Sequence, residues 1–195
     1  GGDPANPEIQ IAVDLVTTSE TCFFREPKHF EFLRKQVLPR IRPSSNFRIW
    51  SAACSTGEEP FSLAMTLADG LNNTTWEIIA SDISSHSLST AQAACYALRR
   101  ARTIPHEVMA KHCLKGSGCQ GKDLQIVPTL RTRVRFVRIN LNETLPDIGS
   151  FDVIFLRNVM MHFDLDTRRE VVARVLKLLK PGGYFIISHS ESLNG

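Results

Sequence analysis

Strands that alternate with helices along this sequence predict an α/β domain with a doubly wound, mostly parallel sheet. Three observations carry this prediction. Short apolar runs typical of buried strands recur, amphipathic segments follow them, and small or polar residues stand where the strands end. Such alternation is typical of a sheet covered by helices on both faces. Ligands bind such sheets beyond the carboxyl ends of the strands, so we expect a site there.

The first half of the chain supplies two strands and three helices to this prediction. The patterns predict helices over 29–41, 58–72 and 84–98 and strands over 47–53 and 76–81. Pro60 is compatible with the first turn of the second helix, where a missing N–H costs nothing. Ser84 is placed to cap the third helix, and Asp82 closes the strand before it.

The second half completes the alternation after one interruption. Strands are expected over 134–139, 151–156 and 184–188, and an amphipathic helix over 166–179. Residues 113–135 depart from the pattern, because glycines precede a short apolar run in Leu124–Val127. We therefore expect a small antiparallel β insertion over 113–135, between a helix and the third strand.

The totals fit one globular domain. The chain has 195 residues, 43% of them hydrophobic, and a net charge of +3. No apolar run reaches the roughly 18 residues of a membrane span, and the first ten residues lack signal-peptide features. Five cysteines at irregular spacing (22, 54, 95, 113 and 119) predict reduced thiols in a cytoplasmic protein. Their spacing to His106 and His112 matches no zinc pattern, so no metal site is expected.

Arginines gather in two stretches, although the overall charge is too balanced to indicate nucleic-acid binding. The stretches are Arg99, Arg100 and Arg102, and Arg131, Arg133, Arg135 and Arg138. Solvated faces are the favoured interpretation, and an acidic protein partner is the alternative.

The first strand-to-helix turn, residues 53–59, indicates the kind of ligand. Gly57 permits an otherwise strained turn, but the GxGxxG pattern that cradles a pyrophosphate is missing. Glu58 and Glu59 stand at the helix start, where they would repel a bound phosphate. These features disfavour dinucleotides and nucleoside triphosphates, and favour a cationic nucleoside such as S-adenosylmethionine (SAM).

Polar residues follow the other strands at the same edge. Asp82 is placed to accept hydrogen bonds from ribose hydroxyls, although an Asp that only ends a strand or caps a helix is the alternative. Asn140 could contact an adenine edge, because an amide both donates and accepts. Arg157 and Asn158 follow an apolar strand and need polar partners, of which a ligand is one.

Five segments closely resemble the chemotaxis receptor methyltransferases, the CheR family. They are TTSETCFFREPKHF (17–30), RIWSAACSTGEEPFSLAM (48–65), ASDI (80–83), LRNVMMHFD (156–164) and LKPGGYFIISHSESLNG (179–195). The resemblance implies a Rossmann-like class I SAM-dependent methyltransferase domain over 17–195. Residues 1–16 would then be a linker or remnant of a helical N-terminal domain, and relatives also continue into a further strand.

The resemblance also assigns residues to the site. Around the cofactor it places Ser19, Thr21, Arg25, Glu59, Asp82, Asn140, Leu141, Arg157 and Asn158. Glu59 would hold the amino-acid end of SAM, and Asp82 its ribose. Arg25 and His162 are the expected catalytic residues, near the methyl donor and the incoming substrate. Ser19 and His162 stand where relatives often carry Asn and Tyr, which leaves their roles open.

The implied activity is methyl transfer from SAM to glutamate carboxylates of bacterial chemoreceptors, with S-adenosylhomocysteine (SAH) as product. A glutamate is already ionised at neutral pH, so the enzyme needs to align the reactants rather than supply a general base. The implied partner is the cytoplasmic domain of the receptors, with a tethering peptide on the β insertion as one reading and a passive hairpin as the other. We expect a monomer without nucleic-acid partner or membrane insertion. The alternatives are a SAM-binding regulatory module and a methyltransferase for nucleic acid or a small molecule.

Overall fold

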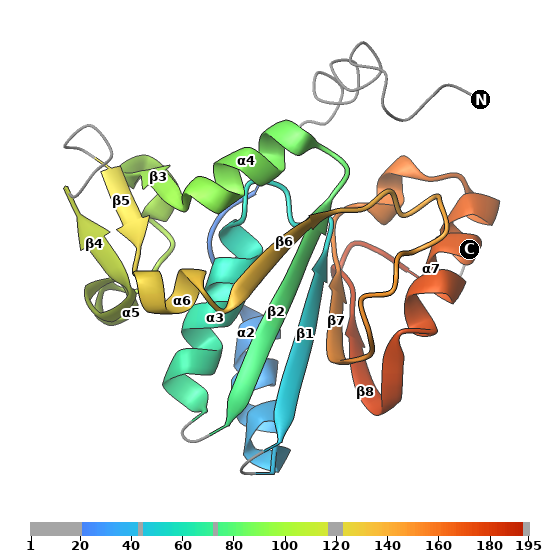
Figure 1. The fold of residues 1–195 in the computed structure, drawn as a ribbon, viewed down its shortest axis with the longest axis horizontal. Coiled ribbons are helices and arrows are strands. Elements are labelled where there is room, and N and C mark those ends of the chain that lie inside the picture. Colours follow the sequence, from blue (N-terminus) through green and yellow to red (C-terminus); the bar gives the residue numbers. More distant parts are fainter. Residues whose placement is uncertain (1–20, 43–44, 72–73, 117–122, 193–195) are drawn as a thin grey trace.

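A five-stranded parallel sheet forms the centre of the computed structural model, which describes residues 21–42, 45–71, 74–116 and 123–192 (Figure 1). Its strands are β1 (Asn46–Ala52), β2 (Thr75–Asp82), β6 (Val134–Arg138), β7 (Phe151–Leu156) and β8 (Leu179–Ile186). Their order is β6-β2-β1-β7-β8, and each neighbouring pair is parallel. The predicted fold class is confirmed.

Helices cover both faces of this sheet. One face carries α2 (Pro27–Phe32), which continues as a π-helix over Leu33–Val37 and a 3-10 turn over Leu38–Arg40, and α3 (Glu58–Gly70). The other carries α7 (Leu165–Leu176), preceded by a 3-10 turn, η4 (Met160–His162). Successive strand residues alternate between the two cores. Ile49 packs in the cluster with Phe30 and Phe61, whereas Trp50 packs in the cluster with Val171.

A second sheet of three antiparallel strands lies beside the first (Figure 1). Its order is β3-β5-β4, with β3 (Cys95–Ala97), β4 (Cys113–Lys115) and β5 (Asp123–Ile126). The intervening elements are η3 (Leu98–Ala101), α5 (His106–His112) and, after β5, α6 (Pro128–Arg131). We call the segment 94–131 the insertion below.

Several element boundaries differ from the sequence-based prediction. The helix capped by Ser84, α4 (Ser85–Ala93), ends five residues before the predicted Leu98, because the left-handed Ala94 breaks it and β3 begins. The predicted cap itself is confirmed, since Ser84 Oγ accepts a hydrogen bond from Ser87 N at 3.0 Å. The small sheet includes β3, which lies outside the predicted range of 113–135. The hydrophobic pattern did not predict β3, because this strand has only three residues.

The thiols also differ in part from expectation. Cys22, Cys54 and Cys113 are free, but Cys95 is disulfide-bonded, so the prediction of reduced cysteines throughout was wrong for this residue. Among the residues that the structure describes, no helix combines the length and apolarity that a membrane crossing requires. The predicted segment 1–16, Ser19 and Cys119 lie outside the described residues.

Candidate functional site

A cavity of about 310 Å³ opens at the carboxyl edge of the large sheet, beside the ends of β1 and β7. The chain order reverses between these two strands, since β2 and β6 lie on one side and β8 on the other. This is the position at which open α/β sheets bind ligands. The cavity volume is within the range of small-molecule sites.

The turn from Ala53 to Gly57, which we call the β1–α3 turn, forms one wall. Ala53, Ser55 and Gly57 all have positive φ, at 61°, 50° and 94°. Cys54 N donates to Ser81 O at 2.8 Å, which ties the turn to β2. A Cβ on Gly57 would lie 2.7 Å from Tyr96 Oη and 2.8 Å from Ala91 Cβ. Only glycine therefore fits this position without strain, as the sequence predicted.

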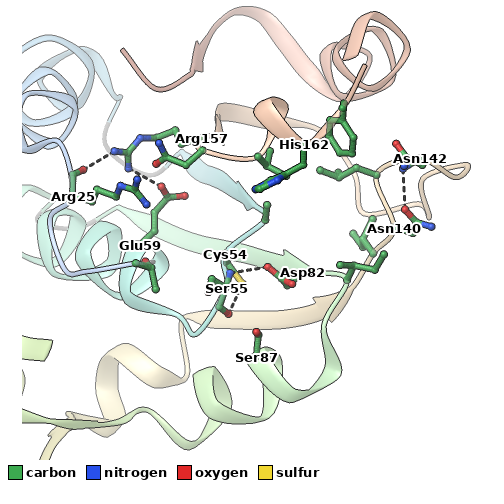
Figure 2. Close-up of a pocket in the computed structure, with 18 of the residues that line it drawn as sticks. Arg25, Cys54, Ser55, Glu59, Asp82, Ser87, Asn140, Asn142, Arg157 and His162 are labelled. Atoms are coloured by element: carbon green, nitrogen blue, oxygen red, sulfur yellow. Dashed lines mark hydrogen bonds and ion pairs between the residues drawn. The ribbon is translucent and has the colours of Figure 1, made fainter. Parts of the chain in front are cut away.

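Asp82 occupies the middle of the cavity, between the β1–α3 turn and α4 (Figure 2). Its carboxylate accepts hydrogen bonds from Ser55 N at 2.8 Å and Ser84 N at 3.0 Å. Asp82 thus fixes the turn as well as the entry to α4, while it still lines the cavity. A carboxylate in a cavity wall can accept a hydrogen bond from a ligand hydroxyl.

Glu59 and Arg157 form an ion pair at one end of the cavity (Figure 2). Arg157 Nη1 lies 2.7 Å from Glu59 Oε2, and Ser51 Oγ donates to Glu59 Oε1 at 2.7 Å. Burial raises the pKa of Glu59, while the Arg157 charge and the two hydrogen bonds oppose that rise. The negative charge of Glu59 at the start of α3 is therefore balanced by Arg157. Arg25 lies beside Glu59 in the same wall.

Arg157 also anchors the segment that carries Arg25. Its Nη2 donates to the Arg25 carbonyl at 2.6 Å and lies 3.4 Å from Glu26 Oε2. Burial acts to raise the pKa of Glu26, but the Ser188 hydrogen bond, the Arg157 charge and the His189 N–H outweigh it and lower this pKa to about 2. The strand end of β7 and the segment before α2 are therefore held together by charge-assisted hydrogen bonds.

Glu58 does not contribute to the acidity of the cavity, contrary to the sequence-based expectation. Its side chain is fully buried on the far side of the turn, where Oε1 lies 2.7 Å from Arg100 Nη2. Adjacent residues at a helix start project in different directions, which the residue types alone did not reveal. Of the two predicted carboxylates, Glu59 alone lines the cavity.

Asn140 and Asn142 line the opposite end of the cavity from Glu59 (Figure 2), and Leu141 also belongs to the cavity lining. The Asn140 side chain is held locally, because Oδ1 accepts from Asn142 N at 3.0 Å and Nδ2 donates to Glu143 Oε1 at 2.9 Å. Leu141 is buried and adds an apolar surface beside this amide. A polar edge next to an apolar wall is what a flat heteroaromatic ring requires.

The loop after β7 is shaped by a residue that the sequence reading did not single out. The carboxylate of Glu191 accepts hydrogen bonds from the backbone N–H groups of Asn158, Val159 and Met160, at 2.9–3.0 Å. Asn158 has a left-handed φ of 56°, and its Nδ2 donates to Ser188 Oγ at 3.0 Å. Glu191 therefore sets the course of the loop that carries Asn158 and His162 into the cavity wall.

The structure brings together the predicted site residues that it describes. All nine of them line the cavity: Thr21, Arg25, Glu59, Asp82, Asn140, Leu141, Arg157, Asn158 and His162. Ser19 lies outside the described residues. Their roles towards a ligand stay predictions. The sequence reading missed Glu26 and Glu191, although both lie within motifs that it quoted, because an acidic residue next to an arginine or serine carries no specific signal by itself.

Among the described residues that line the cavity, two buried polar atoms have no hydrogen-bond partner within the described part of the chain. They are Ser55 Oγ and Arg157 Nε. Buried polar groups are usually paired, so the Ser55 hydroxyl is available to a ligand that enters the cavity. Within the described ranges, no group of three His, Cys, Asp or Glu side chains is arranged to hold a metal ion.

Comparison with known proteins identifies a family. Residues 19–195 match the family described as CheR methyltransferase, SAM binding domain. A chemotaxis protein methyltransferase of Salmonella typhimurium is 37% identical over 190 residues, and one of Escherichia coli is 38% identical over 192 residues. Each alignment covers 96% of this chain and 65% of the relative, so the chain spans about two thirds of the length of these relatives.

Solved structures agree at the level of the fold. The glycopeptide N-methyltransferase MtfA complexed with sinefungin superposes with a TM-score of 0.51 at 16% identity, over 93% of this chain and 60% of that one. An O-methyltransferase family protein from Burkholderia thailandensis also gives 0.51, at 20% identity, over 83% of this chain and 37% of that one. These similarities show a shared class I methyltransferase fold.

Proposed function

Since this chain belongs to the CheR methyltransferase family and matches its SAM-binding domain, we propose that it transfers a methyl group from SAM to glutamate carboxylates of bacterial chemoreceptors. The products are glutamate methyl esters and SAH. The printed names of the relatives support the chemotaxis assignment, and the arrangement of the cavity supports the choice of methyl donor.

The observation that carries the proposal is the distribution of acceptors along the cavity. Glu59 lies at one end, Asp82 in the middle, and the Asn140 amide at the other end (Figure 2). SAM presents an amino-acid ammonium, ribose hydroxyls and an adenine edge in the same order along its length. Nothing in the β1–α3 turn provides the glycine-rich cradle that a pyrophosphate needs. The residues present therefore fit SAM better than a dinucleotide.

Each wall residue has a role in this proposal. Glu59 holds the ammonium of the amino-acid end, and the neighbouring Arg25 or Thr21 faces its carboxylate. Asp82 accepts from the ribose hydroxyls, while Asn140 and Leu141 hold the adenine. Arg157 and Asn158 fix the walls around Arg25 and the loop after β7. Ser19 is proposed as a further contact on the basis of the resemblance.

When bound, SAM supplies an electrophilic methyl group with a neutral leaving group. A receptor glutamate is ionised at neutral pH, so its carboxylate needs no proton acceptor. Arg25 has the planar fork that orients a carboxylate by two hydrogen bonds, and it lines the cavity near Glu59. His162 is exposed and lines the same cavity, where we propose that it positions the substrate. Orientation and exclusion of water are the expected contributions of these two side chains.

The insertion is proposed to hold a tethering peptide from the receptor C-terminus. Its sheet has two edge strands, β3 and β4, and an extended peptide can add to such an edge. Leu114 on β4 is 40% exposed, which offers an apolar contact beside that edge. Anisotropy of a labelled receptor C-terminal peptide tests this part; a peptide that shows no saturable binding contradicts it.

We propose that the protein is a cytoplasmic monomer. Light scattering of the isolated chain tests the oligomeric state.

The arginine stretches give little support to a nucleic-acid substrate. Arg100 pairs with Glu58, Arg133 lies over the Trp76 ring, and Arg138 donates to the Ile83 carbonyl. These three of the seven arginines are engaged within the protein and add nothing to a free basic face that would bind phosphates. We therefore propose no nucleic-acid partner.

The test is methylation of receptor membranes with SAM labelled in the methyl group. The proposal expects label in the receptor that base treatment releases as volatile methanol, because methyl esters hydrolyse in alkali. Label that resists alkali would indicate methylation of nitrogen, and label in RNA or a small molecule would indicate another substrate. Either result would overturn the glutamate assignment.

A further inference from the structure

The β1–α3 turn is held from outside the cavity by two residues of the insertion. Tyr96, on β3, donates its hydroxyl hydrogen to the Thr56 carbonyl at 2.8 Å. Arg100, on η3, donates from Nη2 to Thr56 Oγ1 at 3.0 Å. Both lie outside the set of described residues that line the cavity. The hydrogen bonds therefore act on the back of the turn whose front faces the ligand.

The Arg100 contact continues into the start of α3. Arg100 Nη2 lies 2.7 Å from Glu58 Oε1, and Thr56 Oγ1 donates to Glu58 Oε2 at 2.7 Å. The Glu58 side chain is 0% exposed, whereas that of Arg100 is 30% exposed. A buried carboxylate is costly unless it is paired, and Arg100 supplies the positive charge. Thr56, Glu58 and Arg100 form a closed polar triangle behind the cavity.

Tyr96 also contacts the other wall of the site. Its ring packs edge-on against Phe23, with ring centroids 5.0 Å apart. Phe23 follows Cys22 and precedes Arg25 by two residues, and both of these line the cavity. The same hydroxyl limits the space at Gly57, where an added Cβ would lie 2.7 Å away. The Tyr96 side chain thus packs between the β1–α3 turn and the segment that carries Arg25.

We infer that Tyr96 and Arg100 are positioning residues of the cofactor site, through which the insertion controls the conformation of the β1–α3 turn. With Thr56 fixed, Ser55 N remains 2.8 Å from Asp82 Oδ2, and the left-handed turn is maintained. Neither residue touches the ligand, so both act through Thr56. This inference rests on the proposed binding of SAM in the cavity. It gives the insertion a part in cofactor affinity in addition to any peptide that it holds.

The chain offers a matched pair of variants for the Tyr96 hydroxyl. Tyr96 and Tyr184 are its only tyrosines. Tyr184 is half-buried on β8 and accepts a hydrogen bond from Arg40 Nη1 at 3.1 Å, away from the cavity. Tyr96→Phe removes the Thr56 bond and keeps the ring on Phe23. We expect SAM to bind Tyr96→Phe roughly 2- to 10-fold more weakly than wild type, the range of one lost hydrogen bond, and Tyr184→Phe as wild type.

Methylation kinetics separate positioning from general damage. Tyr96→Phe should raise the KM for SAM, while kcat at saturating SAM and the KM for receptor stay near wild type. Unchanged SAM affinity in a folded Tyr96→Phe protein would overturn the inference. If wild type itself binds no SAM, the proposed function fails, and amide exchange of the ligand-free chain still decides whether Tyr96 controls the conformation of the turn. Faster exchange at Ser55 and Gly57 than in wild type supports it, and equal exchange refutes it.

Arg100 is tested by charge rescue. Arg100→Gln leaves the Glu58 carboxylate buried without its partner, and should weaken SAM binding by at least as much as Tyr96→Phe. Adding Glu58→Gln removes the unpaired charge and should restore most of the affinity. Arg99→Gln is the control, because Arg99 is exposed and the change in charge is the same. Wild-type affinity in Arg100→Gln, or no recovery in the double variant, would contradict the role of the triangle. Should Arg100→Gln fail to fold, Tyr96→Phe alone decides.

Discussion

Arg157 and Glu59 join the end of β7 to the start of α3 by an ion pair whose nitrogen and oxygen are 2.7 Å apart. The two residues are 98 positions apart in the chain, yet they meet because β1 and β7 are neighbouring parallel strands. Ala52 on β1 is opposite Leu156 on β7, so the residues after both strands share one edge. The sheet register thereby brings an arginine and a carboxylate together in the wall of the cavity.

The charge of Glu59 is predicted to hold the ammonium of SAM. Glu59→Gln retains a side chain that can bond to Ser51 and Arg157, but it removes the negative charge. We expect SAM to bind roughly 10- to 100-fold more weakly, which corresponds to about 1.5–3 kcal/mol for a hydrogen bond to a charged group. Calorimetric titration measures this. The exposed Glu170→Gln is the control, and wild-type affinity in Glu59→Gln would rule out this role.

Gly57 is predicted to be intolerant of any side chain. Gly57→Ala places a Cβ 2.7 Å from Tyr96 Oη at a φ of 94°, so we expect at least about 1 kcal/mol of destabilisation in urea and weaker SAM binding. Gly182→Ala is a matched control, because Gly182 has a φ of 76° with no atom within 4 Å of a Cβ. Both variants share the strain of positive φ. Equal losses in the two would show that the close approach to Tyr96 is unimportant.

Glu26 is predicted to make the fold sensitive to acid. Its pKa falls from 4.5 to about 2 in the folded protein, so the unfolded chain binds its proton first as the pH drops. The stabilisation is therefore fully present above the unfolded pKa and is lost as the pH falls from there towards about 2. Urea unfolding at pH values from about 6 to about 2, limits that follow from these pKa values, measures the free energy of unfolding. This free energy should fall less steeply with decreasing pH in Glu26→Gln than in wild type. Glu107→Gln, at an exposed position, should follow wild type. Parallel curves for Glu26→Gln and wild type would contradict the role of Glu26.

Cys22 reports on occupancy of the cavity. It is half-buried in the cavity wall, whereas Cys54 is buried and burial raises the pKa of its thiol. We expect iodoacetamide to modify Cys22 and to leave Cys54 unmodified. SAH at 100 times its Kd should reduce the rate at Cys22 to about 1%, the unbound fraction. Mass spectrometry of the labelled peptides measures both sites, and an unchanged rate at Cys22 would place the ligand elsewhere.

Much of the fold and the site was accessible from the sequence, for identifiable reasons. The strand over 151–156 was predicted without error because five of its six residues are apolar and polar residues stand on either side. The site residues at the strand ends could be predicted because parallel strands present their carboxyl ends at one edge. For this reason the positions of Asp82, Asn140 and Arg157 at this edge could be predicted without knowing which side chains they contact.

The features that escaped prediction depend on direction and on contacts distant in sequence. Glu58 and Glu59 are adjacent and identical in type, but one faces Arg100 in the insertion and the other faces Arg157 in the cavity. Glu191 has a structural role only because the fold places its carboxylate next to the backbone N–H groups that follow β7. β3 escaped notice because three residues are too few for a periodicity. Such contacts follow from the tertiary structure, and no local pattern encodes them.

The most direct measurement of the central claim is calorimetric titration of this chain with SAM, SAH and NAD⁺ under the same conditions. Glu59, Asp82 and the single glycine of the β1–α3 turn predict saturable binding of one SAM or one SAH, and no binding of NAD⁺, whose pyrophosphate has no cradle here. Absence of heat with SAM and SAH, or saturable binding of NAD⁺, would contradict the account.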